Sequence, residues 1–169
     1  MPAARQAIYN YHLENGIKAI SPDDVFITNG VSEAAYMAIT AICGPGDEVL
    51  VPTPCYSLWV NMIRMCGGEA VFYDCREDNE WQPDVEDIKR QISPKTKAIL
   101  LINPNNPTGA VYTKDIVQSI YDIARKHNLI ILSDEIYDRL VYPEATHIPT
   151  GSLGDDVLVM TFNGLSKSL

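Results

Sequence analysis

Short apolar runs alternate along this chain with longer segments in which apolar residues recur at helical spacing. The short runs are rich in β-branched residues and are bounded by glycine, proline or polar residues, which is the pattern of strands. The run at 97–102 is apolar enough to be buried on both faces of a sheet. We therefore expect strands at residues 25–28, 48–51, 70–73, 97–102, 129–132 and 157–161.

Helical patterns fill most of the intervals between these runs. The clearest covers Lys114–His127, where apolar side chains repeat along one face. Further helices are expected at residues 32–43, 58–66 and 84–92. Strands separated by helices predict an α/β fold, with a doubly wound, mainly parallel sheet and helices on both faces. Ligands of such sheets bind beyond the carboxyl ends of the strands.

Composition and charge narrow the functional classes. The chain has 169 residues, enough for one large domain, and 46% of them are hydrophobic. Its net charge of -9 provides no basic face for DNA or RNA, so we expect no nucleic-acid partner. No apolar run is long enough to span a bilayer, and the first residues lack the layout of a signal peptide. We therefore expect no membrane association and a cytoplasmic location.

The cysteines and histidines do not have the spacing of a metal site. The four cysteines form no CxxC pair, and the three histidines lie far apart in the sequence. Buried thiols are therefore expected in place of disulfides or a bound metal ion.

Segments with candidate chemistry directly follow the predicted strands. Because parallel strands point their carboxyl ends in the same direction, these segments are expected to gather at one edge of the sheet. They are residues 30–32, 54–56, 103–109, 134–137 and 164–167.

The segment Gly30–Ser32 joins a predicted strand to a predicted helix. The N–H groups of a first helical turn lack partners and the helix dipole is positive there, so a phosphate can bind at this position. Ser32 can equally cap the helix, which is the more common use of such a serine. The residues alone leave both interpretations open.

Residues 103–109 read Asn-Pro-Asn-Asn-Pro-Thr-Gly. Two prolines and a glycine impose an irregular turn directly after an apolar strand and hold asparagine side chains within it. A plain loop needs no such density of constraint, so ligand binding is at least an equal alternative.

Charged residues follow two further strands. Asp134 can bind metal, act as a base or pair with a cation, and metal binding is the weakest of these because no histidine or aspartate cluster is near. Glu135 is interpreted as a helix cap or a solvated acid. Lys167 is a surface lysine by default, although a lysine at the mouth of a site can form a Schiff base with a carbonyl.

Together these segments resemble the fold-type I aminotransferases of class I and II, and most closely their bacterial alanine aminotransferase branch. The order and spacing of the motifs fit that family throughout the chain. The resemblance implies pyridoxal 5′-phosphate as cofactor and a homodimer for the full-length protein. The matching stretches are NGVSEA (29–34), PTPCYSLW (52–59), INPNNPTGAVY (102–112), SDEIYD (133–138) and FNGLSK (162–167).

The resemblance assigns roles around the cofactor's ring. Lys167 would form a Schiff base with the cofactor's aldehyde, and Asp134 would pair with the protonated pyridine nitrogen. Tyr137 and Asn106 would hydrogen-bond the phenolic oxygen, and Asn106 would also help to hold the substrate's carboxylate. Tyr56 would stack on the ring.

The remaining roles concern the phosphate and the backbone. Donors of Gly30, Val31 and Ser32 would hold the cofactor's phosphate. Pro54 and Pro107 match positions at which the family has cis peptide bonds.

The implied reaction transfers an amino group from a small L-amino acid, L-alanine, to a 2-oxo acid, 2-oxoglutarate, in a ping-pong cycle. An aspartate-type transaminase or a carbon–sulfur lyase of the same fold is the alternative, because those enzymes use the same lysine, aspartate and tyrosine. A catalytically inactive fragment is a further interpretation, and we favour it for these residues in isolation.

The resemblance also implies a partial domain. Residues 3–15 resemble a helix of the family, so its N-terminal arm is expected to be missing. A phosphate-binding arginine, the last strand of the large sheet and the C-terminal small domain would all follow Leu169. The family often has a serine at the position of Gly164. Residues 1–169 are therefore expected to form a single, incomplete cofactor-binding large domain, truncated at both ends.

Overall fold

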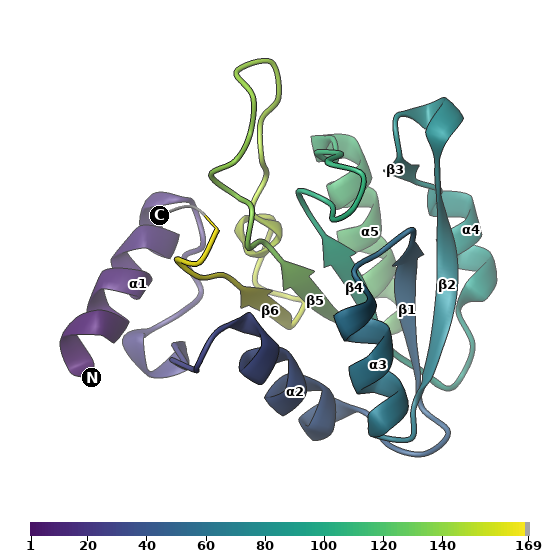
Figure 1. The fold of residues 1–169 in the computed structure, drawn as a ribbon, viewed down its shortest axis with the longest axis horizontal. Coiled ribbons are helices and arrows are strands. Elements are labelled where there is room, and N and C mark those ends of the chain that lie inside the picture. Colours follow the sequence, from purple (N-terminus) through teal and green to yellow (C-terminus); the bar gives the residue numbers. More distant parts are fainter. Residues whose placement is uncertain (168–169) are drawn as a thin grey trace.

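The computed structural model describes residues 1–167, and a six-stranded sheet of order β3-β2-β1-β4-β5-β6 forms its centre (Figure 1). Strands β2, β1, β4, β5 and β6 are parallel to their neighbours, and β3 pairs antiparallel with β2. The bounds are β1 (Glu48–Thr53), β2 (Glu69–Arg76), β3 (Gln82–Pro83), β4 (Thr96–Ile102), β5 (Ile130–Asp134) and β6 (Val159–Phe162).

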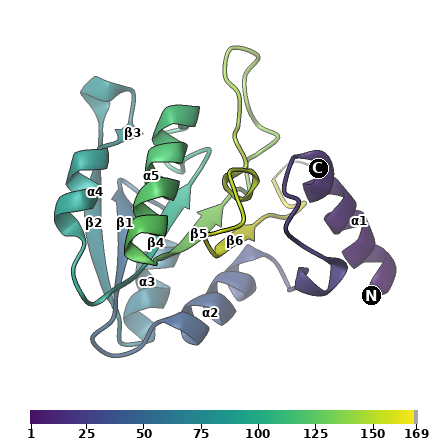
Figure 2. The ribbon, with the colours of Figure 1, turned by 180° about the vertical axis from the view of Figure 1, so that it is seen from behind.

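Helices cover both faces of the sheet (Figures 1 and 2). Helices α2 (Val31–Ile42) and α3 (Ser57–Met65) pack on one face, whereas α4 (Val85–Gln91) and α5 (Lys114–His127) pack on the other. Helix α1 (Pro2–Glu14) lies beyond the β6 side of the sheet. Short 3-10 turns occur at η1 (Pro22–Asp24), η2 (Glu77–Asn79) and η3 (Thr150–Ser152).

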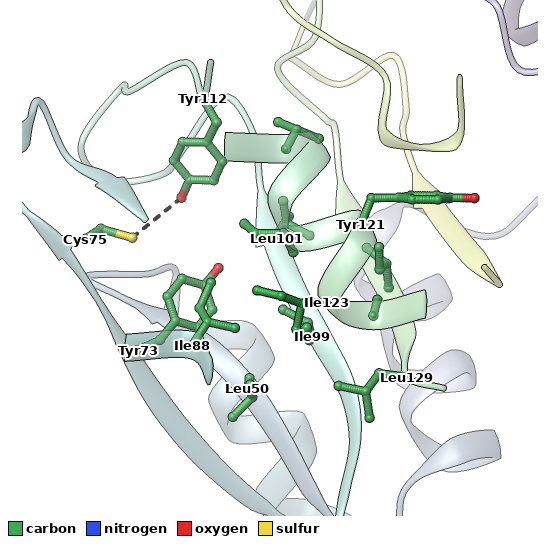
Figure 3. Packing of buried hydrophobic residues seen from close by; sticks show 14 residues of the cluster. Leu50, Tyr73, Cys75, Ile88, Ile99, Leu101, Tyr112, Tyr121, Ile123 and Leu129 are labelled. Carbon is green, nitrogen blue, oxygen red and sulfur yellow. Dashed lines mark hydrogen bonds between the residues drawn. The ribbon is translucent and has the colours of Figure 1, made fainter. Parts of the chain in front are cut away.

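The alternation of side chains in β4 divides the core into two layers. Ile99 and Leu101 belong to the cluster beneath α4 and α5, whereas Leu100 belongs to the cluster beneath α2 and α3. All three are completely buried. Each such side chain contributes about 1.5–3 kcal/mol relative to an exposed one. Figure 3 shows the first cluster, in which Tyr112 Oη lies 3.9 Å from Cys75 Sγ.

The strand order places a topological switch at the centre of the sheet. The chain moves outward from β1 to β2 and then returns past β1 to β4, so β1 and β4 are neighbours whose connections run in opposite directions. Right-handed crossovers then place the connecting helices on opposite faces. The carboxyl ends of β1 and β4, at Thr53 and Ile102, form the edge at which such folds bind ligands.

The predicted α/β fold is confirmed, and the helix predicted at Lys114–His127 has those bounds. Thr113 Oγ1 begins this helix by accepting a hydrogen bond from the Ile116 amide, and Asn128 ends it in the left-handed region at φ 54°. Strand β3 was not predicted, because a two-residue strand has no periodicity. No helix of the described residues has the length and apolar character that crossing a membrane requires.

The strand predicted at residues 25–28 is wrong. The segment is irregular, and Phe26 is 73% exposed. The Val25 amide donates to the Pro22 carbonyl and so closes η1, which Ser21 caps. β-Branched residues favour extended backbone, but a strand also needs a hydrogen-bonded neighbour. Within residues 1–167 this segment pairs with no strand.

Candidate functional site

Asp134 is the most buried of the predicted site residues. It ends β5 and is 4% exposed. Its Oδ2 accepts a hydrogen bond from Trp59 Nε1 at 2.8 Å, and its Oδ1 accepts one from the Ile136 amide at 3.3 Å. Burial raises the pKa of Asp134, and the Trp59 hydrogen bond opposes this rise. No cationic side chain of residues 1–167 pairs with this carboxyl group.

Trp59 is a site residue that the sequence did not reveal. It lies in the first turn of α3, is completely buried, and contacts Phe162 edge to face with ring centroids 4.9 Å apart. A tryptophan within an amphipathic helix reads as an ordinary core residue, because its partner Asp134 is 75 positions away. Its N–H fixes the orientation of the carboxylate.

The turn after β4 is held together by Asn105. This buried side chain donates to Tyr112 Oη at 3.1 Å and accepts from the Thr108 hydroxyl at 2.9 Å. In contrast, the half-buried side chain of Asn106 makes no hydrogen bond within the described residues. The two asparagines therefore have different roles. Asn105 stabilises the turn, and the side chain of Asn106 is available at the turn's surface for hydrogen bonding to a ligand.

Cis peptide bonds precede three prolines of this edge. Those before Pro54 and Pro107 were predicted, and the structure confirms them. The third, before Pro104, was not predicted.

Gly30 is the N-cap of helix α2, and it has φ 83° and open space around the position that a Cβ would occupy. No side chain caps this helix, so the capping role considered for Ser32 is wrong. Ser32 instead lies exposed within the first turn beside the half-buried Val31. The uncapped amides and the open space together can accept an anionic group.

The chain after β6 passes close to both neighbouring segments. A Cβ on Gly164 would lie 3.2 Å from Ile136 Cδ1 and 3.8 Å from Val31 Cγ2. The start of α2, the turn after β5 and the turn after β6 are therefore brought together, as the sequence predicted for one sheet edge. The Cβ of a serine at position 164 would therefore be in tight contact with Ile136.

The other predicted site residues lie around this edge and are more exposed to solvent than Asp134. Tyr56 precedes the first turn of α3 and is 45% exposed, and Tyr137 is half-buried in the turn after β5. Lys167 is exposed in the turn after β6, and its amine makes no ion pair within residues 1–167. The structure thus shows no ion pair between Lys167 and Asp134.

Glu135 was interpreted as a cap or a solvated acid, and that interpretation is wrong. Its side chain is buried, and Oε1 accepts hydrogen bonds from Ser133 Oγ at 2.8 Å and from the Thr150 amide at 3.1 Å. Burial raises the pKa of Glu135 to about 7, although these hydrogen bonds oppose the rise. The neighbouring carboxylates at positions 134 and 135 therefore point into different environments.

All four cysteines are free, with Cys43 and Cys75 buried. Within residues 1–167 no group of three or more histidine, cysteine, aspartate or glutamate side chains could hold a metal ion.

The donor set at this edge fits pyridoxal 5′-phosphate. Asp134 is a buried carboxylate without a cationic partner in the described chain, which suits a protonated ring nitrogen. The uncapped start of α2 suits a phosphate, and the exposed Tyr56 ring offers an aromatic face.

Known proteins resemble the whole chain. The family model described as aminotransferase class I and II matches residues 1–169. Glutamate-pyruvate aminotransferase AlaA of Haemophilus influenzae is 51% identical over 98% of this chain and 41% of that protein. An aspartate aminotransferase of Thermotoga maritima is 39% identical over 94% and 44%. The solved structure of an aminotransferase from Escherichia coli superposes with a TM-score of 0.97, at 46% identity, over 99% and 42%. The chain thus spans about two fifths of the length of these proteins.

Proposed function

Because the chain belongs to the class I and II aminotransferases, we propose that the whole protein transfers an amino group from L-alanine to 2-oxoglutarate with pyridoxal 5′-phosphate as cofactor. The single observation that carries this proposal is the buried, cation-free carboxylate of Asp134 at the sheet's ligand edge, held by Trp59. The likeness to AlaA, named a glutamate-pyruvate aminotransferase, supports the choice of substrates.

Asp134 has the central electrostatic role in this proposal. When bound, pyridoxal phosphate supplies an electron-withdrawing ring that stabilises negative charge developing at the substrate's Cα. Asp134 would hold the ring nitrogen in its protonated form, because a buried carboxylate favours a proton on its partner over an unpaired charge. Trp59 would keep Oδ2 occupied and so direct Oδ1 toward the ligand.

Other residues of this edge would bind and orient. The first-turn amides of α2 and the Ser32 hydroxyl would hold the phosphate, and Tyr56 would cover one face of the ring. Tyr137 and Asn106 would donate hydrogen bonds to the ring's oxygen. The amine of Lys167 would attach the cofactor and then, once released, carry the proton away from the substrate's Cα.

An aspartate-type transaminase is the second candidate. The likeness to the aspartate aminotransferase of Thermotoga maritima supports it. Both reactions use the same residues of this chain, so a comparison of L-alanine with L-aspartate as amino donor to 2-oxoglutarate decides between them on the whole protein.

We further propose that residues 1–169 are one partial cofactor-binding domain of a longer protein. The chain's span of about two fifths of its relatives supports this. We also propose that the whole protein is a cytoplasmic homodimer.

Borohydride reduction tests the site directly. The whole protein is mixed with pyridoxal phosphate, reduced, digested and mapped by mass spectrometry. We expect a pyridoxyl group on Lys167, absent in Lys167→Ala and retained in the control Lys126→Ala, whose lysine is exposed on α5. Labelling that is scattered over the exposed lysines, or that survives Lys167→Ala, would contradict the assignment.

A further inference from the structure

Asp138 accepts hydrogen bonds from two segments that are far from it in the sequence. It lies in the turn after β5, directly after Tyr137, and is half-buried. Its Oδ2 accepts one hydrogen bond from the Tyr11 hydroxyl of α1 and a second, at 2.7 Å, from Asn163 Nδ2. One carboxylate oxygen therefore joins three separate parts of the chain, which are α1, the turn after β5 and the segment after β6.

The turn that carries Asp138 is itself held by backbone hydrogen bonds. The Asp138 amide donates to the Glu135 carbonyl at 3.0 Å, and the Leu140 amide donates to the Tyr137 carbonyl at 2.8 Å. The Glu135 amide in turn donates to the Phe162 carbonyl at 2.8 Å, which joins this turn to the end of β6. Because the backbone on both sides of Asp138 is bonded, its carboxylate has a defined position from which it can hold other segments.

The side chain of Asn163 connects Asp138 to the backbone after β6. Its Nδ2 donates to Asp138, and its Oδ1 accepts a hydrogen bond from the Gly164 amide at 2.7 Å. Because both groups belong to one planar amide, a bond at Nδ2 fixes the direction in which Oδ1 points. Lys167 follows Gly164 in the same turn. The contact with Asp138 therefore determines where the segment that carries the Lys167 amine begins.

Helix α1 is held at the same place by Tyr11. Besides donating to Asp138, the Tyr11 hydroxyl accepts a hydrogen bond from Arg139 Nε at 3.5 Å, and Arg139 Cζ lies 4.5 Å from the centroid of the Tyr11 ring. A guanidinium group over an aromatic ring is a favourable contact. Figures 1 and 2 show the segment after β6, coloured yellow, running toward α1. Asp138 thus connects α1, which carries none of the predicted site residues, to the segment of Lys167.

The second oxygen of Asp138 takes no part in these contacts. Asp138 lines a cavity of about 270 Å³ together with Tyr11, His12 and His147. Its buried Oδ1 has no hydrogen-bond partner within the described residues. An asparagine whose carbonyl oxygen takes the place of Oδ2 can therefore accept both hydrogen bonds, because such an oxygen has two lone pairs. Asp138→Asn is accordingly the conservative variant.

We propose that Asp138 is a positioning residue for Lys167, which acts through the Asn163 side chain on the backbone at Gly164 and fastens this segment to α1. The part of this inference that concerns Lys167 rests on the proposed function. The part that concerns the local structure rests on the hydrogen bonds that Asp138 accepts from Tyr11 and Asn163.

Amide hydrogen exchange in the whole protein, without added cofactor, tests the local part. Asp138→Ala removes the acceptor, whereas Asp138→Asn retains one. We expect the Gly164 amide to exchange about tenfold faster in Asp138→Ala, the effect of losing one hydrogen bond of ordinary strength, and at nearly the wild-type rate in Asp138→Asn. Asp155→Ala, which removes an exposed aspartate, is the matched control. The Glu69 amide, bonded to the Asp47 carbonyl, serves as the reference.

Three results would overturn the positioning role. They are unchanged exchange at Gly164 in Asp138→Ala, equal acceleration at Glu69, and no difference between Asp138→Asn and Asp138→Ala. If Asp138→Ala does not fold, Asp138→Glu replaces it, because Glu keeps the charge but moves the carboxylate outward by one methylene group. The Gly164 amide should then exchange faster in Asp138→Glu than in Asp138→Asn, and the reverse order would refute the proposal.

A double-mutant cycle tests the connection to α1. Tyr11→Phe removes only the hydroxyl that donates to Asp138 and accepts from Arg139. We expect the shift in the urea midpoint caused by Tyr11→Phe to fall by about half when Asp138 has already been replaced by alanine, because residues in direct contact are not additive. Equal shifts in the two backgrounds would contradict the fastening of α1 by Asp138.

The rate of pyridoxyl labelling at Lys167 tests the functional part on the whole protein. We expect Asp138→Ala to slow this labelling about tenfold, because a misplaced amine less often has a reactive geometry, and Asp138→Asn to restore it. If the wild type gives no label on Lys167 while the exchange pattern is as expected, the proposed function fails and the local positioning role stands. If Asp138→Ala is labelled at the wild-type rate, the positioning role toward Lys167 fails and the proposed function stands.

Discussion

Trp59 Nε1 donates a hydrogen bond to Asp134 Oδ2 across 2.8 Å, which joins the first turn of α3 to the end of β5. The bond lies at the carboxyl edge of a parallel sheet and is buried on all sides. It satisfies one oxygen of a carboxylate that would otherwise be buried with only a backbone amide at 3.3 Å. The pair therefore links core packing to the chemistry of the site.

Trp59→Phe should lower the free energy of unfolding by about 1–3 kcal/mol, because it leaves a buried carboxylate oxygen without its donor. The pKa of Asp134 should rise further, since the Trp59 hydrogen bond now opposes the rise. Urea unfolding followed by circular dichroism measures the stability. Trp81→Phe is the control, because Trp81 is the chain's other tryptophan and its indole N–H donates to no carboxylate within residues 1–167. An equal loss of stability in both variants would show that ring size alone is responsible.

Glu135→Gln should change how stability depends on pH. Burial raises the pKa of Glu135 from 4.5 to about 7 in the folded chain, so its protonated form is favoured there. The stability that this group contributes is complete below about pH 4.5 and is lost as pH rises through about 7. Gln imitates the protonated form at every pH. The variant should therefore gain stability relative to the wild type between pH 5 and 8, on the order of a few kcal/mol.

The control for this prediction is Glu144→Gln, because Glu144 is exposed and also lies between β5 and η3. The groups that face Glu135 are His147, Asp138 and Asp134. The pKa shift of His147 has the opposite sign. Burial lowers this pKa, so the stability that His147 contributes is lost as pH falls below 6.5. Because His147 is present in both proteins, most of its contribution cancels in the difference in unfolding free energy between Glu135→Gln and wild type. A difference in unfolding free energy that is flat from pH 5 to 8 would be inconsistent with a protonated, buried Glu135.

Asp134→Asn should keep part of the cofactor binding and lower kcat/KM of the whole protein about 10²–10³-fold, as the loss of one electrostatic partner in a buried site does. Asn can still accept the Trp59 hydrogen bond, so the fold should be retained. Steady-state assays with L-alanine and 2-oxoglutarate measure the effect, with Asp155→Asn as an exposed control. Turnover near the wild-type rate would remove Asp134 from the mechanism.

Substitution of the two neighbouring asparagines should separate structure from binding. Asn105→Ala removes the bonds to Tyr112 and Thr108 and should destabilise the chain by about 1–3 kcal/mol. Asn106→Ala removes no hydrogen bond within the described residues, so stability should change by less than about 0.5 kcal/mol while pyridoxal phosphate binds more weakly. Thermal unfolding and absorbance titration of the two variants measure both quantities. Equal destabilisation would contradict the division of roles.

The sequence by itself determined most of the alternating strands and helices and the segments that carry chemistry. Helical periodicity fixed α5 at Lys114–His127, and the density of proline and asparagine at 103–109 marked an unusual turn. These features are local, because periodicity and turn residues act within a few positions of the chain. The placement of each motif after a strand then followed from the geometry of parallel sheets.

Only the tertiary structure decided which partners these residues have. Trp59 and Asp134 are 75 positions apart, and no local pattern links them. Glu135 looks like a surface acid until the segment around His147 and Thr150 covers it. The segment at 25–28 has the residues of a strand but pairs with no strand within residues 1–167. Burial and hydrogen bonding between distant segments depend on how the whole chain packs, and therefore the sequence pattern could not supply them.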